Sequence, residues 1–90
     1  MADTIQGMNV AEVTRIGRQL QTEARNMGDL VSRVRTQVAI AERNWEGNDA
    51  SHFIKDWQGS QQQLNDLQSQ LSSLGGKAMA EAKQQDTASK

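Results

Sequence analysis

Apolar and small residues recur at alternating steps of three and four through the first half of the chain. The pattern runs from Val10 to Trp45 without a polar member, and a heptad repeat of this length indicates a single amphipathic helix. Asn9 suits the capping position before the first turn, and Glu12 follows at the spacing of a capping box. We therefore predict a helix over 9–44. The pattern positions within it are Val13, Gly17, Leu20, Ala24, Met27, Val31, Val34, Val38 and Ala41.

A second pattern with the same spacing extends from Ala50 to Ala78. It predicts a second helix, for which Asp49 or Asn48 is a suitable N-cap. The pair Gly75-Gly76 supplies residues that commonly end a helix, so we predict a helix over 50–74 and a flexible tail over 77–90. The pattern positions are Ala50, Phe53, Trp57, Ser60, Leu64, Leu67, Leu71, Leu74 and Ala78.

The two patterns are out of phase with each other, because Trp45 and Ala50 are five residues apart. The segment 45–49 between them contains Gly47 and two residues that favour turns, so the chain is expected to reverse there. A connection this short places the helices side by side and antiparallel. The predicted fold is an all-α helix-turn-helix hairpin over 9–76, preceded by a flexible segment over 1–8. Trp45 and Trp57 flank the turn and are expected to pack across this end of the hairpin.

Two helices alone leave part of each apolar stripe uncovered. Ile16 and Leu30 lie beside the first pattern and Ile54 beside the second, which makes both stripes wider than one neighbouring helix can cover. We therefore expect two hairpins to associate as a four-helix bundle, either as a homodimer or as a heterodimer with a related hairpin. The residues assigned to the core of the hairpin or dimer are Val13, Ile16, Leu20, Met27, Val31, Val34, Val38, Phe53, Trp57, Leu64, Leu67, Leu71 and Leu74.

Composition and charge offer little support for catalysis or for binding to nucleic acid or membranes. The chain has no Cys and no Pro, and its net charge of −1 is distributed without a strong field of one sign. No apolar run is long enough to cross a membrane, and residues 1–10 lack the basic start and apolar stretch of a signal peptide. We therefore expect neither a membrane span nor a cleaved signal. His52 and Asp56 share a helix face, but a lone imidazole with nearby carboxylates lacks an oriented nucleophile and a second strong metal ligand. We therefore expect no enzyme activity, no metal and no cofactor.

The tripeptide Trp45-Glu46-Gly47 at mid-chain, followed by Ala50, Phe53 and Trp57 and flanked by long helices, resembles the WXG family of early-secreted-antigen-like proteins. The resemblance covers roughly residues 10–74. It implies an antiparallel hairpin that dimerises as a four-helix bundle and is exported without a cleaved signal peptide by the bacterial type VII (ESX-like) secretion system. It also implies that Trp45 and Gly47 belong to the element that the secretion ATPase recognises.

The chain departs from that family in its tail. The family signal is a Tyr followed four residues later by Asp or Glu, and this chain has no Tyr. Either the tail carries a variant signal or a partner protein supplies one. The resemblance thus leads us to expect a secreted protein, cytoplasmic before export, that acts by protein binding as an effector or as the co-secreted partner of a larger toxin. A cytoplasmic coiled-coil adaptor or targeting chaperone for such a toxin is the alternative.

Overall fold

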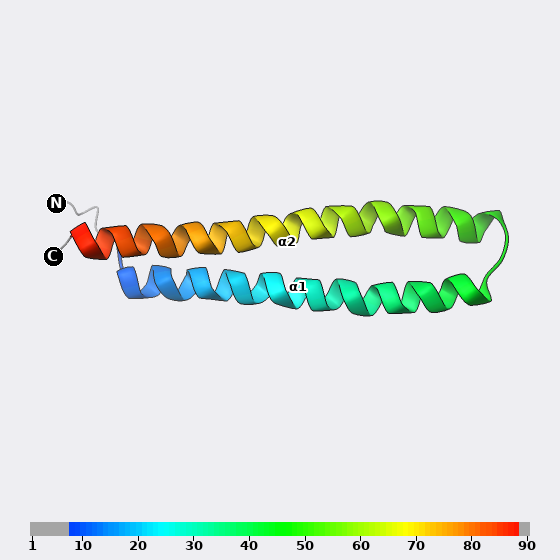
Figure 1. Ribbon diagram of the computed structural model, residues 1–90, viewed down its shortest axis with the longest axis horizontal. Coiled ribbons are helices and arrows are strands. Elements are labelled where there is room, and N and C mark those ends of the chain that lie inside the picture. The colour runs from blue at the N-terminus through cyan, green and yellow to red at the C-terminus, as the bar shows by residue number, and fades with distance from the viewer. Residues whose placement is uncertain (1–7, 89–90) are drawn as a thin grey trace.

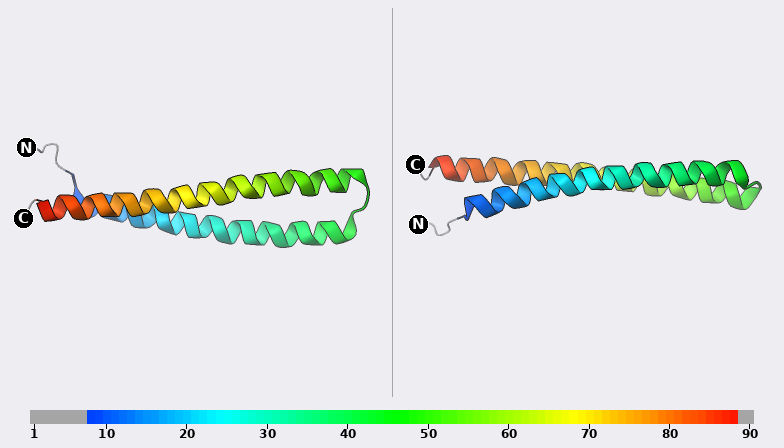
Figure 2. Two further views of the ribbon diagram at one scale, coloured as in Figure 1. Left: turned by 45° about the horizontal axis from the view of Figure 1, so that its top comes forward. Right: turned by 90° about the horizontal axis from the view of Figure 1, so that it is seen from below.

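The computed structural model describes residues 8–88, which form two long antiparallel helices joined by a tight turn (Figure 1). Helix α1 spans Val10–Asn44 and helix α2 spans Asn48–Ala88. The Cα atoms occupy an envelope of 65 × 16 × 13 Å, and the two helices cross each other gradually along its length (Figure 2). This confirms the predicted all-α hairpin. The predicted flexible segment 1–8 lies, apart from Met8, outside the described residues.

The start of α1 follows from its capping residue. Asn9 has an extended backbone, with φ −78° and ψ 93°, and its Oδ1 accepts a hydrogen bond from the Glu12 N–H at 3.0 Å. This satisfies one of the amides that the first helical turn leaves without a backbone partner. The Glu12 carboxylate pairs with Arg15, whose Nε donates to it at 2.6 Å. The predicted cap is therefore confirmed, as is the end of α1 at Asn44.

The α1 pattern predicted from the sequence is the side that faces α2. Gly17, Ala24 and Val31 are buried, and the other pattern positions up to Ala41 are half-buried. For α2 the prediction is correct only at alternate positions, because Ala50, Trp57, Leu64, Leu71 and Ala78 are the members that lie toward α1. The other four predicted positions, Phe53, Ser60, Leu67 and Leu74, do not face α1, and in each case the next residue along the chain does. The residues turned toward α1 in their place are Ile54, Gln61, Gln68 and Gly75.

The close approach of Gly17 and Gly75 explains both this rotation of α2 and its length. A Cβ added to Gly75 would lie 2.6 Å from the Gly17 carbonyl oxygen, so the two backbones touch at this level. Neither glycine interrupts its helix, because the neighbouring helix covers the backbone that a missing side chain would expose. The predicted helix end near Leu74 and the predicted flexible tail from Lys77 are therefore wrong as far as Ala88. Ala82, which is fully buried, continues the contact beyond the glycines.

The turn is shorter than the predicted segment 45–49. Trp45 is extended at the end of α1, with φ −140° and ψ 124°, and Gly47 has a φ of 103° that other residues rarely adopt. The Gly47 carbonyl oxygen accepts a hydrogen bond from the Ser51 N–H at 3.2 Å. Asn48 and Asp49 already belong to α2, so neither is its N-cap as predicted. Asp49 instead places a carboxylate in the first turn, where the helix dipole favours negative charge.

Candidate protein-binding surfaces

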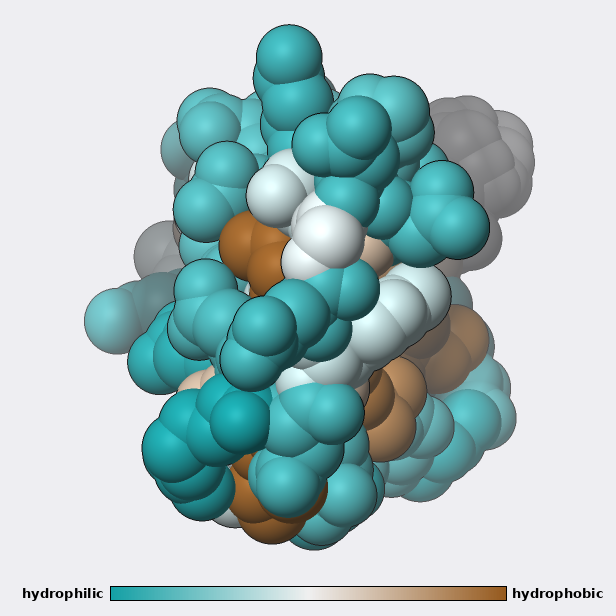
Figure 3. Space-filling view, turned by 90° about the vertical axis from the view of Figure 1, so that its right-hand side faces the viewer, coloured by the Kyte–Doolittle hydropathy of each residue, from teal (hydrophilic) through white to brown (hydrophobic). Residues whose placement is uncertain are grey.

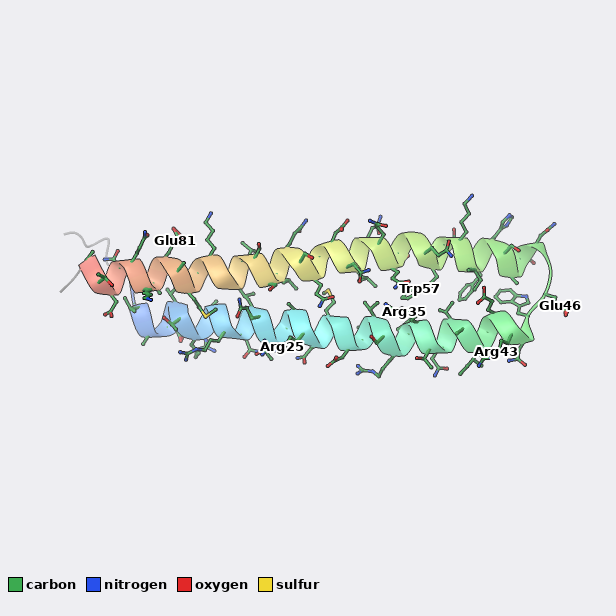
Figure 4. All side chains as sticks on the ribbon, viewed as in Figure 1. Arg25, Arg35, Arg43, Glu46, Trp57 and Glu81 are labelled. Carbon is green, nitrogen blue, oxygen red and sulfur yellow. The ribbon has the colours of Figure 1, made fainter. Side chains whose placement is uncertain are left out.

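The turn end of the hairpin presents partly exposed aromatic side chains. Trp45 is 42% exposed, and its ring packs against Phe53 with 5.4 Å between ring centroids and an angle of 44° between the planes. Tilted contacts of this kind are favourable for aromatic pairs. The expected contact between the two tryptophans is replaced by this pair. Trp57 lies between the helices near Arg35, whereas Glu46 projects outward from the turn (Figure 4).

A shallow cavity of about 420 Å³ lies beside the turn. Trp45, Ala50 and Ile54 provide apolar lining, and Glu42 and Lys55 place opposite charges at it. The remaining lining residues are Gly47, Ser51 and Gln58. Viewed from the turn, the surface around it is mostly hydrophilic, with small separate hydrophobic patches (Figure 3). An open hollow with mixed lining is suited to a side chain of another protein rather than to an enclosed small molecule.

A second candidate surface consists of exposed apolar side chains on both helices. Besides Trp45 and Ile40, five large apolar side chains remain about half exposed, with fractions of 41–54%. They are Ile16, Leu30, Phe53, Leu67 and Leu74, and we call them the apolar face. Four of them had been assigned to the core from sequence. Within a single hairpin these four are not buried, and they are Ile16, Phe53, Leu67 and Leu74. One of the predicted core residues, Val31, is fully buried. The others are half-buried, and they are Val13, Leu20, Met27, Val34, Val38, Trp57, Leu64 and Leu71.

Two polar contacts link the helices. Gln21 Nε2 donates to the Ser72 carbonyl oxygen at 3.4 Å. When the Gln61 amide is oriented with its oxygen toward Arg35, that oxygen accepts from Arg35 Nη2 at 3.0 Å and from Nε at 3.1 Å. In the second contact the Arg35 guanidinium and the Gln61 amide oxygen satisfy each other. The heptad pattern did not indicate these contacts, because Gln61 was not one of its members.

Within residues 8–88, the ionisable groups with perturbed pKa values lie on the surface of α1. Hydrogen bonding and attraction to Arg15 lower the pKa of Glu12, and hydrogen bonds from Asn26 and Gln19 lower the pKa of Glu23. Both carboxylates are exposed, so these are local helix contacts rather than signs of a reactive centre.

The candidates for catalysis or metal binding, His52 and Asp56, do not form an enclosed site. His52 and Asp56 are both exposed on α2. Across residues 8–88, no group of three or more His, Asp or Glu side chains is placed to hold a metal ion. None of the helices in this part of the chain is long and apolar enough to span a membrane.

Comparison of the chain with models of known families, with curated proteins and with solved structures finds no match. The resemblance to the WXG family therefore depends on the residues quoted above and on the spacing between them.

Proposed function

We propose that this protein is an exported helical hairpin that works by binding other proteins, through a type VII-like pathway of the kind used by the WXG family. The observation that carries the proposal is the position of the Trp45-Glu46-Gly47 turn, which joins two long amphipathic helices. Trp45 is held half exposed by Phe53 beside a shallow hollow, so it is available to a partner. Half-exposed aromatic side chains often anchor protein interfaces.

The partners proposed are a related or identical hairpin, the secretion ATPase and, where the protein travels as an escort, a larger toxin. The apolar face supports the first of these, because a row of exposed aliphatic and aromatic side chains is unfavourable in water. The Trp45 turn supports the second, since it lies at the far end of the molecule from Val10 and Ala88 and remains accessible (Figure 1).

Export is tested by comparing the culture supernatant of the native host with that of a strain lacking the type VII ATPase. We expect the protein in the first and its loss from the second. Equal amounts in both strains would refute this route of export.

A variant at Trp45 separates export from the alternative of a cytoplasmic adaptor. Trp45→Ala removes the exposed ring, whereas Trp45→Phe keeps a ring that packs on Phe53 and serves as the matched control. Under the export proposal Trp45→Ala reduces secretion several-fold while the intracellular protein retains its helix content and mass. An adaptor that never leaves the cell would show no difference between the two variants in the supernatant and would lose only client binding.

A further inference from the structure

The arginines and lysines of the chain are separated between the two helices. All six arginines lie in α1, whereas the basic residues of α2 are lysines. Helix α1 combines six Arg with four Asp or Glu residues and has a net charge of +2. Helix α2 combines three Lys with five Asp or Glu residues and has a net charge of −2. The near-neutral charge of the whole chain therefore conceals a basic helix beside an acidic one.

Four of the arginines follow one another along the exposed surface of α1. They belong to a series that advances in steps of three and four residues and so stays on one side of the helix. Its members are Arg18, Thr22, Arg25, Asp29, Arg33, Thr36, Ile40 and Arg43, all exposed except the half-buried Thr22. We call its four arginines, Arg18, Arg25, Arg33 and Arg43, the arginine row. Figure 4 shows Arg25 and Arg43 on the side of α1 away from α2, whereas Arg35 lies toward Trp57.

The arginine row has no carboxylate partner within the hairpin. The other two arginines are engaged, because Arg15 donates to Glu12 and Arg35 donates to the oriented Gln61 oxygen. In the row, Arg25 Nη2 donates to the Thr22 hydroxyl at 3.1 Å, and no ion pair within residues 8–88 holds any of the four guanidinium groups. A guanidinium group presents a planar fork of donors that fits a carboxylate with two parallel hydrogen bonds. These donors are directed away from the hairpin and remain available to a partner.

We propose that the arginine row binds an acidic helix of another protein, one that repeats Asp or Glu about every second turn. This inference goes beyond the proposed function, which uses the Trp45 turn and the apolar face. The row rises about 10.5 Å from Arg18 to Arg25 and about 12 Å from Arg25 to Arg33. Carboxylates at every seventh residue of a helix recur at about 10.5 Å, whereas side chains on one side of an extended segment recur at about 7 Å. A helical partner therefore matches the row better than an extended one.

The other members of the series favour a protein partner over a nucleic acid. Asp29 lies between Arg25 and Arg33, where it would repel a phosphate backbone. Ile40 is 41% exposed within the same series and offers an apolar contact that a helix side chain can use and a phosphate cannot. A partner helix that is mainly acidic, with a basic residue opposite Asp29 and an apolar one opposite Ile40, is complementary to all of these positions.

Titration of the full chain into a labelled synthetic helix tests the proposal. The probe has about four heptads with Glu at one heptad position and Ala and Gln elsewhere, and the control peptide has the same composition with Glu distributed around the helix. We expect the probe to bind at least about threefold more tightly than the control by fluorescence anisotropy, and salt at about 0.5 M to abolish the difference. Equal binding of the two peptides would overturn the inference. So would tighter binding of single-stranded DNA or of vesicles that contain phosphatidylglycerol.

Two double variants locate the binding surface. Arg25→Gln with Arg33→Gln removes two charges from the row, and we expect it to weaken binding of the probe about threefold to tenfold. Lys77→Gln with Lys83→Gln removes the same charge from α2 and should change binding less than about twofold. All four positions are exposed, so both variants keep the helix content, which circular dichroism verifies. Equal losses in the two variants would show a non-specific charge effect and refute the assigned surface.

The type of cation is tested by Arg25→Lys with Arg33→Lys, which keeps the charge and loses the guanidinium fork. We expect binding between that of the wild type and that of the glutamine variant, and wild-type affinity would overturn the role of the guanidinium groups. NMR of the arginine Nε–H groups adds a readout within one molecule. The probe should shift the signals of the arginine row and leave those of Arg15 and Arg35 unchanged, and the reverse pattern would refute the row. None of these measurements depends on export, so loss of the proposed secretion route would leave their outcome unaffected.

Discussion

Replacement of Gly75 by alanine probes the closest contact between the two helices. The added Cβ would lie 2.6 Å from the Gly17 carbonyl oxygen and 2.7 Å from Gln21 Cγ. A backbone oxygen cannot move without its helix, so the helices must separate locally. Overpacking of this kind costs about 1–3 kcal/mol. It is opposed by the better helix propensity of alanine, which contributes about 1 kcal/mol. We expect Gly75→Ala to lower the free energy of unfolding by up to about 2 kcal/mol relative to the wild type.

Gly59 provides the matched control on the same helix. A Cβ at Gly59 meets no atom within 4 Å, so Gly59→Ala gains the helix propensity without a clash. The two variants should therefore differ by about 1–3 kcal/mol. For a chain of this size, 1 kcal/mol corresponds to about 4–8 °C in Tm. Thermal unfolding followed by circular dichroism, at one protein concentration, measures the difference. If Gly75→Ala melted at or above Gly59→Ala, the close approach of Gly17 and Gly75 would be refuted.

Three further outcomes follow from local contacts. Asn9→Ala removes the cap at the start of α1 and should cost about 1 kcal/mol in urea unfolding while the Glu12 amide exchanges faster, whereas unchanged exchange would count against the cap. Gly47→Ala should cost about 1–2 kcal/mol although its Cβ has free space, because φ is 103°, and a neutral effect would show that the turn adopts another conformation. Glu12 should titrate below the ordinary pKa of Glu by NMR, and Arg15→Ala should raise it toward that value. Because the folded-state pKa of Glu12 is lowered, the stabilisation from this pair is present above the unfolded pKa and is lost as pH falls through the folded pKa. If Arg15→Ala left the Glu12 titration unchanged, the contact between Glu12 and Arg15 would be refuted.

The sequence predicted α1 almost completely but predicted only half of the contact face of α2. In α1 the predicted cap, spacing and helix end agree with the structure, since the apolar residues there lie on the side that packs against α2. In α2 three of the large apolar residues of the pattern, Phe53, Leu67 and Leu74, lie beside the contact rather than in it. Hydrophobic periodicity identified the apolar stripe, whose width exceeds what one neighbouring helix covers. The contact within that stripe is fixed by the Gly17 and Gly75 approach, and a hydropathy pattern gives little weight to glycine.

The same glycines misled the prediction of the helix end. Gly75-Gly76 resembles a terminating signal when α2 is considered alone, because glycine lowers helix propensity. In the hairpin, Gly75 is buried against α1 and the alanines that follow favour a helix as far as Ala88. The position of the turn after Trp45 was predicted correctly. The contact of Trp45 with Phe53 was not, because it depends on how α2 is rotated about its axis. That rotation is a property of the two helices together.

The hairpin brings Val10 and Ala88 to one end of the molecule and leaves the Gly47 turn at the other (Figure 1). A fluorescent protein or affinity tag fused at either end of the chain would therefore project away from the turn. Labels attached in this way should leave the aromatic end unobstructed, whereas an insertion between Trp45 and Asn48 would place its cargo directly over that end.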